Sequence, residues 1–109
     1  MRIRPDTMTR LSAVIFCLFI AIAPAQAGDA EHGKVLATRW CSNCHQVGSR
    51  MPAQDAVPPL REVAARPYAT KQWLTGWLIN PHPPMPKLDL TRQEIDDLVA
   101  FLLTLRTPR

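Results

Sequence analysis

The order of apolar and polar positions divides the chain into an apolar leader, three amphipathic helices and one irregular stretch. The clearest pattern covers residues 90–105, where apolar side chains recur every three or four positions and form a stripe of Ile95, Leu98, Val99, Leu102 and Leu105. Asp96 and Asp97 are expected to point away from this stripe. Thr91 and Glu94 have the spacing of a capping box, so we predict that a helix begins beside them.

A second helix is predicted over residues 29–40, where Asp29 can cap the first turn. Gly33 lies inside this segment, although glycine costs a helix about 1 kcal/mol relative to alanine. The glycine indicates that another helix crosses close to the backbone, with Phe101 as the side chain that meets it, or else that the helix start frays. His32 is expected to be solvated.

Residues 70–80 predict a further helix that Thr70 caps and Pro81 ends, because the residue before a proline is disfavoured in helical conformation. Its broad apolar face consists of Trp73, Leu74, Trp77 and Leu78. Residues 46–67 show no sustained periodicity and are rich in proline. We therefore predict an ordered loop there.

The leader has the features of a secretory signal peptide. Residues 11–23 are apolar and uncharged, a basic start precedes them, and residues 24–27 end in an A-x-A cleavage pattern. Residues 1–27 are predicted to be removed, which leaves a single domain of residues 28–109. The apolar run is shorter than the roughly 20 residues that span a bilayer, so an uncleaved membrane anchor is the less favoured alternative.

The most specific motif is Cys41-Ser-Asn-Cys44-His45, the C-x-x-C-H pattern of covalent c-type haem attachment. On one helical turn both sulfurs and the imidazole share a face, so the cysteines can bind haem c while His45 binds its iron. Removing the leader also removes Cys17, so Cys41 and Cys44 are the only cysteines left in residues 28–109. A haem-free thiol redox module or a zinc module would need a βαβ context or further ligands.

Two proline-containing segments can complete the iron site. An iron-bound histidine normally donates its second N–H to an acceptor, and we predict the carbonyl of Pro58 for this role, with an ordinary rigid turn as the alternative. Met85 lies in residues 81–86, where four prolines restrict the backbone and preorganise a weak thioether ligand. We predict Met85 as the sixth iron ligand; His82, Met51 or an open position are the alternatives.

Charge adds little to this picture. The formal net charge of +4 falls to +2 after processing, because the leader carries three basic residues and one acidic residue. Two haem propionates would nearly cancel the remainder. Nucleic-acid binding therefore has no support.

With these motifs the chain resembles the small class I monohaem cytochromes c of bacteria. The resemblance rests on six features in order: Gly33 eight residues before the first haem cysteine, Cys41-x-x-Cys44-His45, Pro58-x-Leu60, Asn80-Pro81, Met85-Pro86 and Leu98-x-x-Phe101-Leu102. It implies an all-α class I cytochrome c fold, with three main helices around covalent haem c and the first and last helices crossed near Gly33 and Phe101. It also implies His45 and Met85 as axial ligands.

The function implied is one-electron transfer in the periplasm, with Fe(III)/Fe(II) cycling. The expected partners are redox proteins: a donor dehydrogenase or cytochrome complex and an acceptor oxidase or reductase. No stable membrane insertion is expected after cleavage. Two alternatives stay open, a cytochrome subunit of a periplasmic dehydrogenase and a haem enzyme or gas sensor with an openable sixth position. Trp77 is expected to touch the haem or simply to pack in the core, and candidates for propionate binding are Arg61, Arg66, Tyr68 and Trp73.

Overall fold

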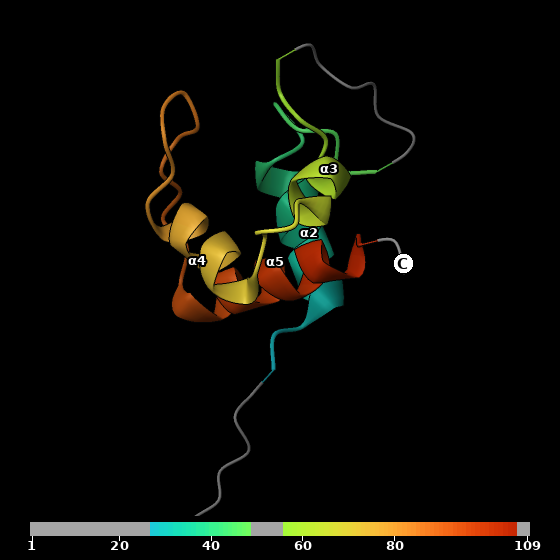
Figure 1. Ribbon diagram of the computed structural model, residues 1–109. Helices are drawn as coiled ribbons and strands as arrows, with labels where there is room; N and C mark the ends of the chain where they lie inside the picture. Colours follow the sequence, from blue (N-terminus) through green and yellow to red (C-terminus); the bar gives the residue numbers. More distant parts are fainter. Residues whose placement is uncertain (1–26, 49–55, 107–109) are drawn as a thin grey trace, which may run out of the picture.

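The computed structural model describes residues 27–48 and 56–106, so residues 1–26 of the predicted leader and Met51 lie outside the described residues. The described residues form the helices α2 (Ala30–Trp40), α3 (Leu60–Ala65), α4 (Lys71–Ile79) and α5 (Arg92–Thr104). Helix α5 contacts each of the other three, and α2 crosses it (Figure 1). None of the helices in this part of the chain is long and apolar enough to cross a membrane.

The three long helices confirm the predicted segments and their caps. The side chain of Asp29 accepts hydrogen bonds from the first turn of α2, and the hydroxyl of Thr70 accepts one from the backbone of α4. Thr91 and Glu94 form both hydrogen bonds of the predicted capping box. These short polar side chains satisfy backbone N–H groups that have no partner inside the helix, which is why the helices begin where they do.

The crossing of α2 and α5 confirms the prediction made from Gly33. A Cβ atom added at Gly33 would lie 2.0 Å from the carbonyl oxygen of Asp97 and 2.9 Å from the Cβ of Phe101. Gly28 is equally close to α5, since its Cβ would lie 2.1 Å from the carbonyl oxygen of Asp96. Glycine therefore allows the two backbones to touch, and close packing rather than fraying explains Gly33.

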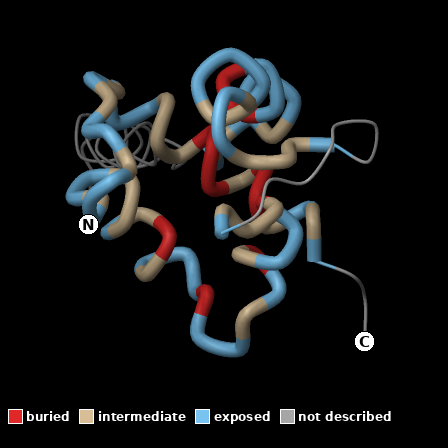
Figure 2. The backbone as a smooth tube through the Cα atoms, turned by 90° about the horizontal axis from the view of Figure 1, so that it is seen from above, coloured by how far each residue is buried: buried red, intermediate tan, exposed pale blue. Residues whose placement is uncertain are grey.

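The core is formed where the apolar faces of the four helices meet. Buried stretches are short and alternate with exposed ones along the backbone, as amphipathic helices require (Figure 2). Phe101, the side chain expected to meet Gly33, is part of this core. Its members are Leu36, Ala37, Leu60, Ala69, Leu74, Leu98, Val99, Phe101 and Leu102, and Cys41 packs against it.

The predicted loop over residues 46–67 is wrong for residues 60–65, which form α3. Pro59 occupies the N-cap position with φ of −55°, so its ring already holds the helical φ, and the buried side chains of Leu60 and Ala64 lie one turn apart. A helix of six residues offers only one such apolar pair. Its periodic signal is therefore too short to be recognised in the sequence.

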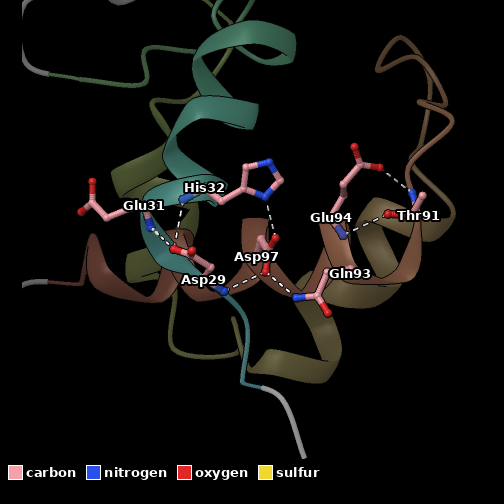
Figure 3. Close-up of polar contacts among 7 residues, drawn as sticks. All are labelled: Asp29, Glu31, His32, Thr91, Gln93, Glu94 and Asp97. Atoms are coloured by element: carbon pink, nitrogen blue, oxygen red, sulfur yellow. Dashed lines mark hydrogen bonds and ion pairs between the residues drawn. The ribbon is translucent and has the colours of Figure 1, made fainter.

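Two predictions for polar side chains are also wrong. Asp97 does not point outward but is 2% exposed, and its carboxylate accepts hydrogen bonds from the backbone N–H of Asp29 at 2.7 Å and from Gln93 Nε2 at 2.8 Å. His32 is not merely solvated, because its Nδ1 lies 2.7 Å from Asp97 Oδ2 (Figure 3). Polar partners at the start of α2 offset the free-energy cost of burying this carboxylate.

Candidate functional site

The Cys41-to-His45 segment continues α2 by one turn. The N–H of Cys41 donates to the carbonyl of Ala37 at 2.8 Å, and the N–H groups of Cys44 and His45 both donate to the carbonyl of Cys41, at 3.2 and 2.8 Å. The predicted helical turn is therefore present. Cys41 is half-buried against the core and Cys44 is exposed, so the turn reaches from the interior to the surface.

Burial raises the pKa of the Cys41 thiol to about 11. Redox-active thiols usually have a lowered pKa, because the thiolate is the reacting form. The buried surroundings of Cys41 therefore do not favour the thiol redox alternative, whereas a thioether bond to haem leaves no charge on the sulfur.

His45 is oriented by its second nitrogen. Nδ1 lies 2.7 Å from the carbonyl oxygen of Pro58, and a carbonyl can only accept, so Nδ1 carries the proton. The N–H of Leu60 donates to the carbonyl of Gln46 at 3.0 Å and holds the Pro58 segment beside the haem motif. The structure thus contains the contact predicted for Pro58, and it leaves the Nε2 lone pair of His45 available for a metal.

Met85 lies half-buried at the end of a tight turn. Its backbone N–H donates to the carbonyl of His82 at 3.0 Å, which closes the turn. The His82 ring stands edge-on against Trp77, with ring centroids 4.2 Å apart and planes at 79°. Helix α4 therefore supports the segment that presents Met85. Met51, the other methionine considered as a ligand, lies outside the described residues.

Four aromatic rings form a continuous row along α4. Tyr68 contacts Trp73 with ring centroids 5.2 Å apart, Trp73 contacts Trp77 at 5.2 Å, and Trp77 contacts His82. Trp73 and Trp77 are half-buried, so each keeps ring surface exposed. This surface can cover a flat cofactor, and the contact of Trp77 with haem stays a prediction.

The other candidates for propionate binding lie on or beside α3. Arg61 is exposed on the helix, and Arg66 is half-buried at its C-terminal end. Each of the four candidates, including Tyr68 and Trp73, offers hydrogen-bond donors that suit a carboxylate. Their contacts with the haem propionates stay predictions.

Arg106 is a positioning residue that sequence reasoning missed. Its Nε donates to the carbonyl of Ala64 at 2.9 Å, and its Nη2 donates to the carbonyl of Ala69. The guanidinium thereby ties the end of α5 to the connection between α3 and α4. No local pattern marks this residue, since its partners are 42 and 37 positions away.

The assembled residues fit a haem bound through two thioethers. The two cysteines and His45 project from one turn of backbone. The Nδ1 of His45 is protonated and its Nε2 is available for a metal. Helix α4 and the turn that follows it supply the Met85 thioether and several aromatic rings. A neutral imidazole with a fixed tautomer is the form that binds iron.

Comparison with known proteins supports the same cofactor. Residues 30–106 match the family described as Cytochrome c. The chain is 41% identical over 95 residues to cytochrome c-552 of Bradyrhizobium diazoefficiens, covering 83% of this chain and 91% of that protein. It is 28% identical over 103 residues to cytochrome c6 of Rippkaea orientalis, covering 88% and 93%. No solved structure gives a significant match.

Proposed function

The chain belongs to the cytochrome c family, and we propose that it is a periplasmic one-electron carrier whose haem iron is bound by His45 and Met85. Membership of this family means that the protein is a class I cytochrome c, an electron carrier rather than an enzyme, which exchanges electrons with partner proteins. One haem c is attached covalently through Cys41 and Cys44. When bound, it supplies an iron centre that alternates between Fe(III) and Fe(II).

The Pro58 carbonyl gives His45 its role as the first axial ligand. By accepting the Nδ1–H hydrogen bond at 2.7 Å it fixes the plane of the ring and makes Nε2 more basic. The proton stays on Nδ1 while Nε2 binds the iron, because the Pro58 carbonyl cannot take the proton up. This contact is the single observation that carries the proposal, since it prepares the imidazole for a metal and serves no evident packing purpose.

Met85 would be the second axial ligand. A thioether is a weak, neutral donor that favours Fe(II) and raises the reduction potential. The closed turn from His82 to Met85 and the prolines around it reduce the conformational entropy lost on presenting the sulfur. Two occupied axial positions would leave the iron no room for a substrate, in keeping with a carrier.

Export to the periplasm rests on residues 1–27, and the close packing at Gly28 supports the proposed boundary. Its Cβ would lie 2.1 Å from the Asp96 carbonyl oxygen, so residue 28 packs against α5, as expected if it belongs to the mature domain. The partner proteins would be a donor dehydrogenase or cytochrome complex and an acceptor oxidase or reductase. With the mature charge close to balance, electron-transfer rates should depend only mildly on ionic strength.

The test is the absorption spectrum of the ferric holoprotein purified from the periplasm. A Met-to-iron charge-transfer band is expected in the far red at neutral pH. It should disappear in Met85→Leu and persist in the matched control Met51→Leu. A wild-type protein without this band, or a band lost only in Met51→Leu, would refute ligation by Met85. Mass spectrometry of the same sample should give residues 28–109 plus one haem.

A further inference from the structure

The chain contains three histidines, and two of them already have partners that define their roles. His45 follows the haem cysteines and donates to Pro58. His32 lies at the crossing of α2 and α5, where it is paired with the buried carboxylate of Asp97 at 2.7 Å. His82 is the remaining imidazole, and neither helix capping nor core packing accounts for it.

His82 shares one feature with His45, a backbone carbonyl within hydrogen-bond distance of its Nδ1. Its Nδ1 lies 2.8 Å from the carbonyl oxygen of Pro83, so Nδ1 again carries the proton and Nε2 holds the lone pair. At His45 the corresponding distance, to Pro58, is 2.7 Å. A histidine whose Nδ1–H is bound to a backbone carbonyl has the tautomer that ligates metals through Nε2.

The position of His82 places this imidazole next to the proposed sixth ligand. His82 and Met85 begin and end one tight turn, joined by the 3.0 Å hydrogen bond from Met85 N–H to the His82 carbonyl. The ring rests against Trp77, and no residue of the 81–86 segment is buried. Exchange of one side chain for the other therefore requires rearrangement of a surface turn and leaves the core undisturbed.

We propose that His82 is a reserve axial ligand, whose Nε2 binds the haem iron in place of the Met85 thioether when that sulfur is not available. The proposal rests on the ligation by His45 and Met85 put forward above. The exchange replaces an iron–sulfur bond by an iron–nitrogen bond, with no net transfer of electrons or protons, since Nδ1 keeps its hydrogen. Imidazole is the stronger donor, so the exchanged form has a lower reduction potential and stays low-spin.

The experiment compares ferric holoproteins by electron paramagnetic resonance and visible absorption at neutral pH. Met85→Ala is expected to be low-spin with two imidazole ligands, and Met85→Ala/His82→Asn is expected to be high-spin. The matched control is Met85→Ala/Lys87→Gln, which removes the nearby exposed amine and should remain low-spin. Cyanide should bind Met85→Ala/His82→Asn at least about tenfold more tightly than Met85→Ala, because it displaces no internal ligand.

A high-spin Met85→Ala protein would overturn the proposal, as would a low-spin signal that persists after His82 is also replaced. The single variant His82→Asn loses the ring contact with Trp77 but keeps the backbone hydrogen bond that closes the turn, so the Met-to-iron absorption should persist. Its loss there would assign His82 a role in holding the turn instead. These outcomes are separate from failure of the proposed function. Absence of the Met-to-iron absorption from the wild-type protein refutes Met85 ligation, whereas its presence together with a high-spin Met85→Ala protein refutes only the role of His82.

Discussion

The crossing of α2 and α5 and the turn that carries Met85 are built in opposite ways. At the crossing, backbone touches backbone at Gly33, Asp97 is buried, and Phe101 fills the adjacent core. In residues 81–86 no residue is buried, and the contacts seen there are the turn hydrogen bond, the hydrogen bond from His82 Nδ1 to the Pro83 carbonyl and the His82–Trp77 ring pair. The difference separates two roles: the crossing stabilises the fold, and the turn is the segment that we propose to supply the sixth iron ligand.

Gly33→Ala should produce the largest loss of stability. The new methyl group would lie 2.0 Å from the Asp97 carbonyl oxygen, which cannot move without separating the helices. We expect the free energy of unfolding of the holoprotein to fall by about 3 kcal/mol in denaturant titrations. The haem absorption spectrum of the folded protein should not change.

The matched control is Gly76→Ala in α4, where an added Cβ meets nothing within 4 Å. This substitution should stabilise the protein by about 0.5–1 kcal/mol through helix propensity. Equal effects at both glycines would show that helix propensity, and not the close approach of α2 and α5, decides the cost at Gly33.

Asp97→Ala should have the next largest effect. It removes the acceptor shared by the Asp29 N–H, His32 and Gln93, and it leaves donors at the crossing without their partner. The expected loss is about 2 kcal/mol in the free energy of unfolding. Asp96→Ala is the control, because among the described residues no hydrogen bond is seen for the Asp96 side chain. A similar loss in both variants would attribute the effect to charge alone.

Arg106→Gln tests the connection between the two regions, because this guanidinium holds the segment that leads into α4. Loss of the hydrogen bonds to Ala64 and Ala69 should cost about 1 kcal/mol in thermal unfolding. Arg92→Gln, at the start of α5, is the charge-matched control and should be close to neutral. If both variants lose the same stability, charge rather than the two carbonyl contacts is responsible.

The smallest expected effect concerns how the stability contributed by His32 at the crossing of α2 and α5 depends on pH. The hydrogen bond to Asp97 raises the pKa of His32 above its ordinary value of 6.5, despite desolvation, with the charges of Asp97, Asp29 and Glu94 adding to it. Because the pKa is higher in the folded state, the stabilisation is complete below the ordinary pKa and is lost as pH rises through the raised value. The Tm advantage of wild type over His32→Gln should therefore be larger at about pH 6 than at about pH 9. An advantage that does not vary with pH would contradict protonation of His32 as its source.

The pKa of Asp97 sets the lower limit of the pH range in which the pair of His32 and Asp97 stabilises the fold. Burial opposes ionisation of the carboxyl, but hydrogen bonds from His32, the Asp29 N–H and Gln93 together outweigh it and lower the pKa below the ordinary 3.8. Its contribution is present above that ordinary value and is lost as pH falls through the lowered one. The comparison at about pH 6 therefore has the carboxylate ionised.

Features with a local cause could be predicted from the sequence. Helix α5 follows from its apolar stripe and capping box, the haem turn follows from the cysteine and histidine spacing, and Gly33 could be assigned to a crossing because a glycine there has a helix cost to explain. The Pro58 contact could be anticipated because an iron-bound imidazole needs an acceptor for its second N–H.

Features decided by distant partners could not be predicted. Asp97 has the local context of a solvated charge, and its burial depends on Asp29 and His32, 68 and 65 residues away. Arg106 likewise gains its role only through the carbonyls of Ala64 and Ala69, 42 and 37 residues away. Helix α3 could not be predicted for another reason, since its six residues contain too little periodicity to be distinguished from a proline-rich loop.

The ferrous holoprotein offers the most direct test of the closed iron site, through the methionine methyl resonances of residues 28–109. Only Met51 and Met85 remain in that segment, so two methyl signals are expected. One should be shifted strongly upfield by the haem ring and should vanish in Met85→Leu. Two methyl signals at ordinary positions, or an upfield signal that survives in Met85→Leu, would contradict the account.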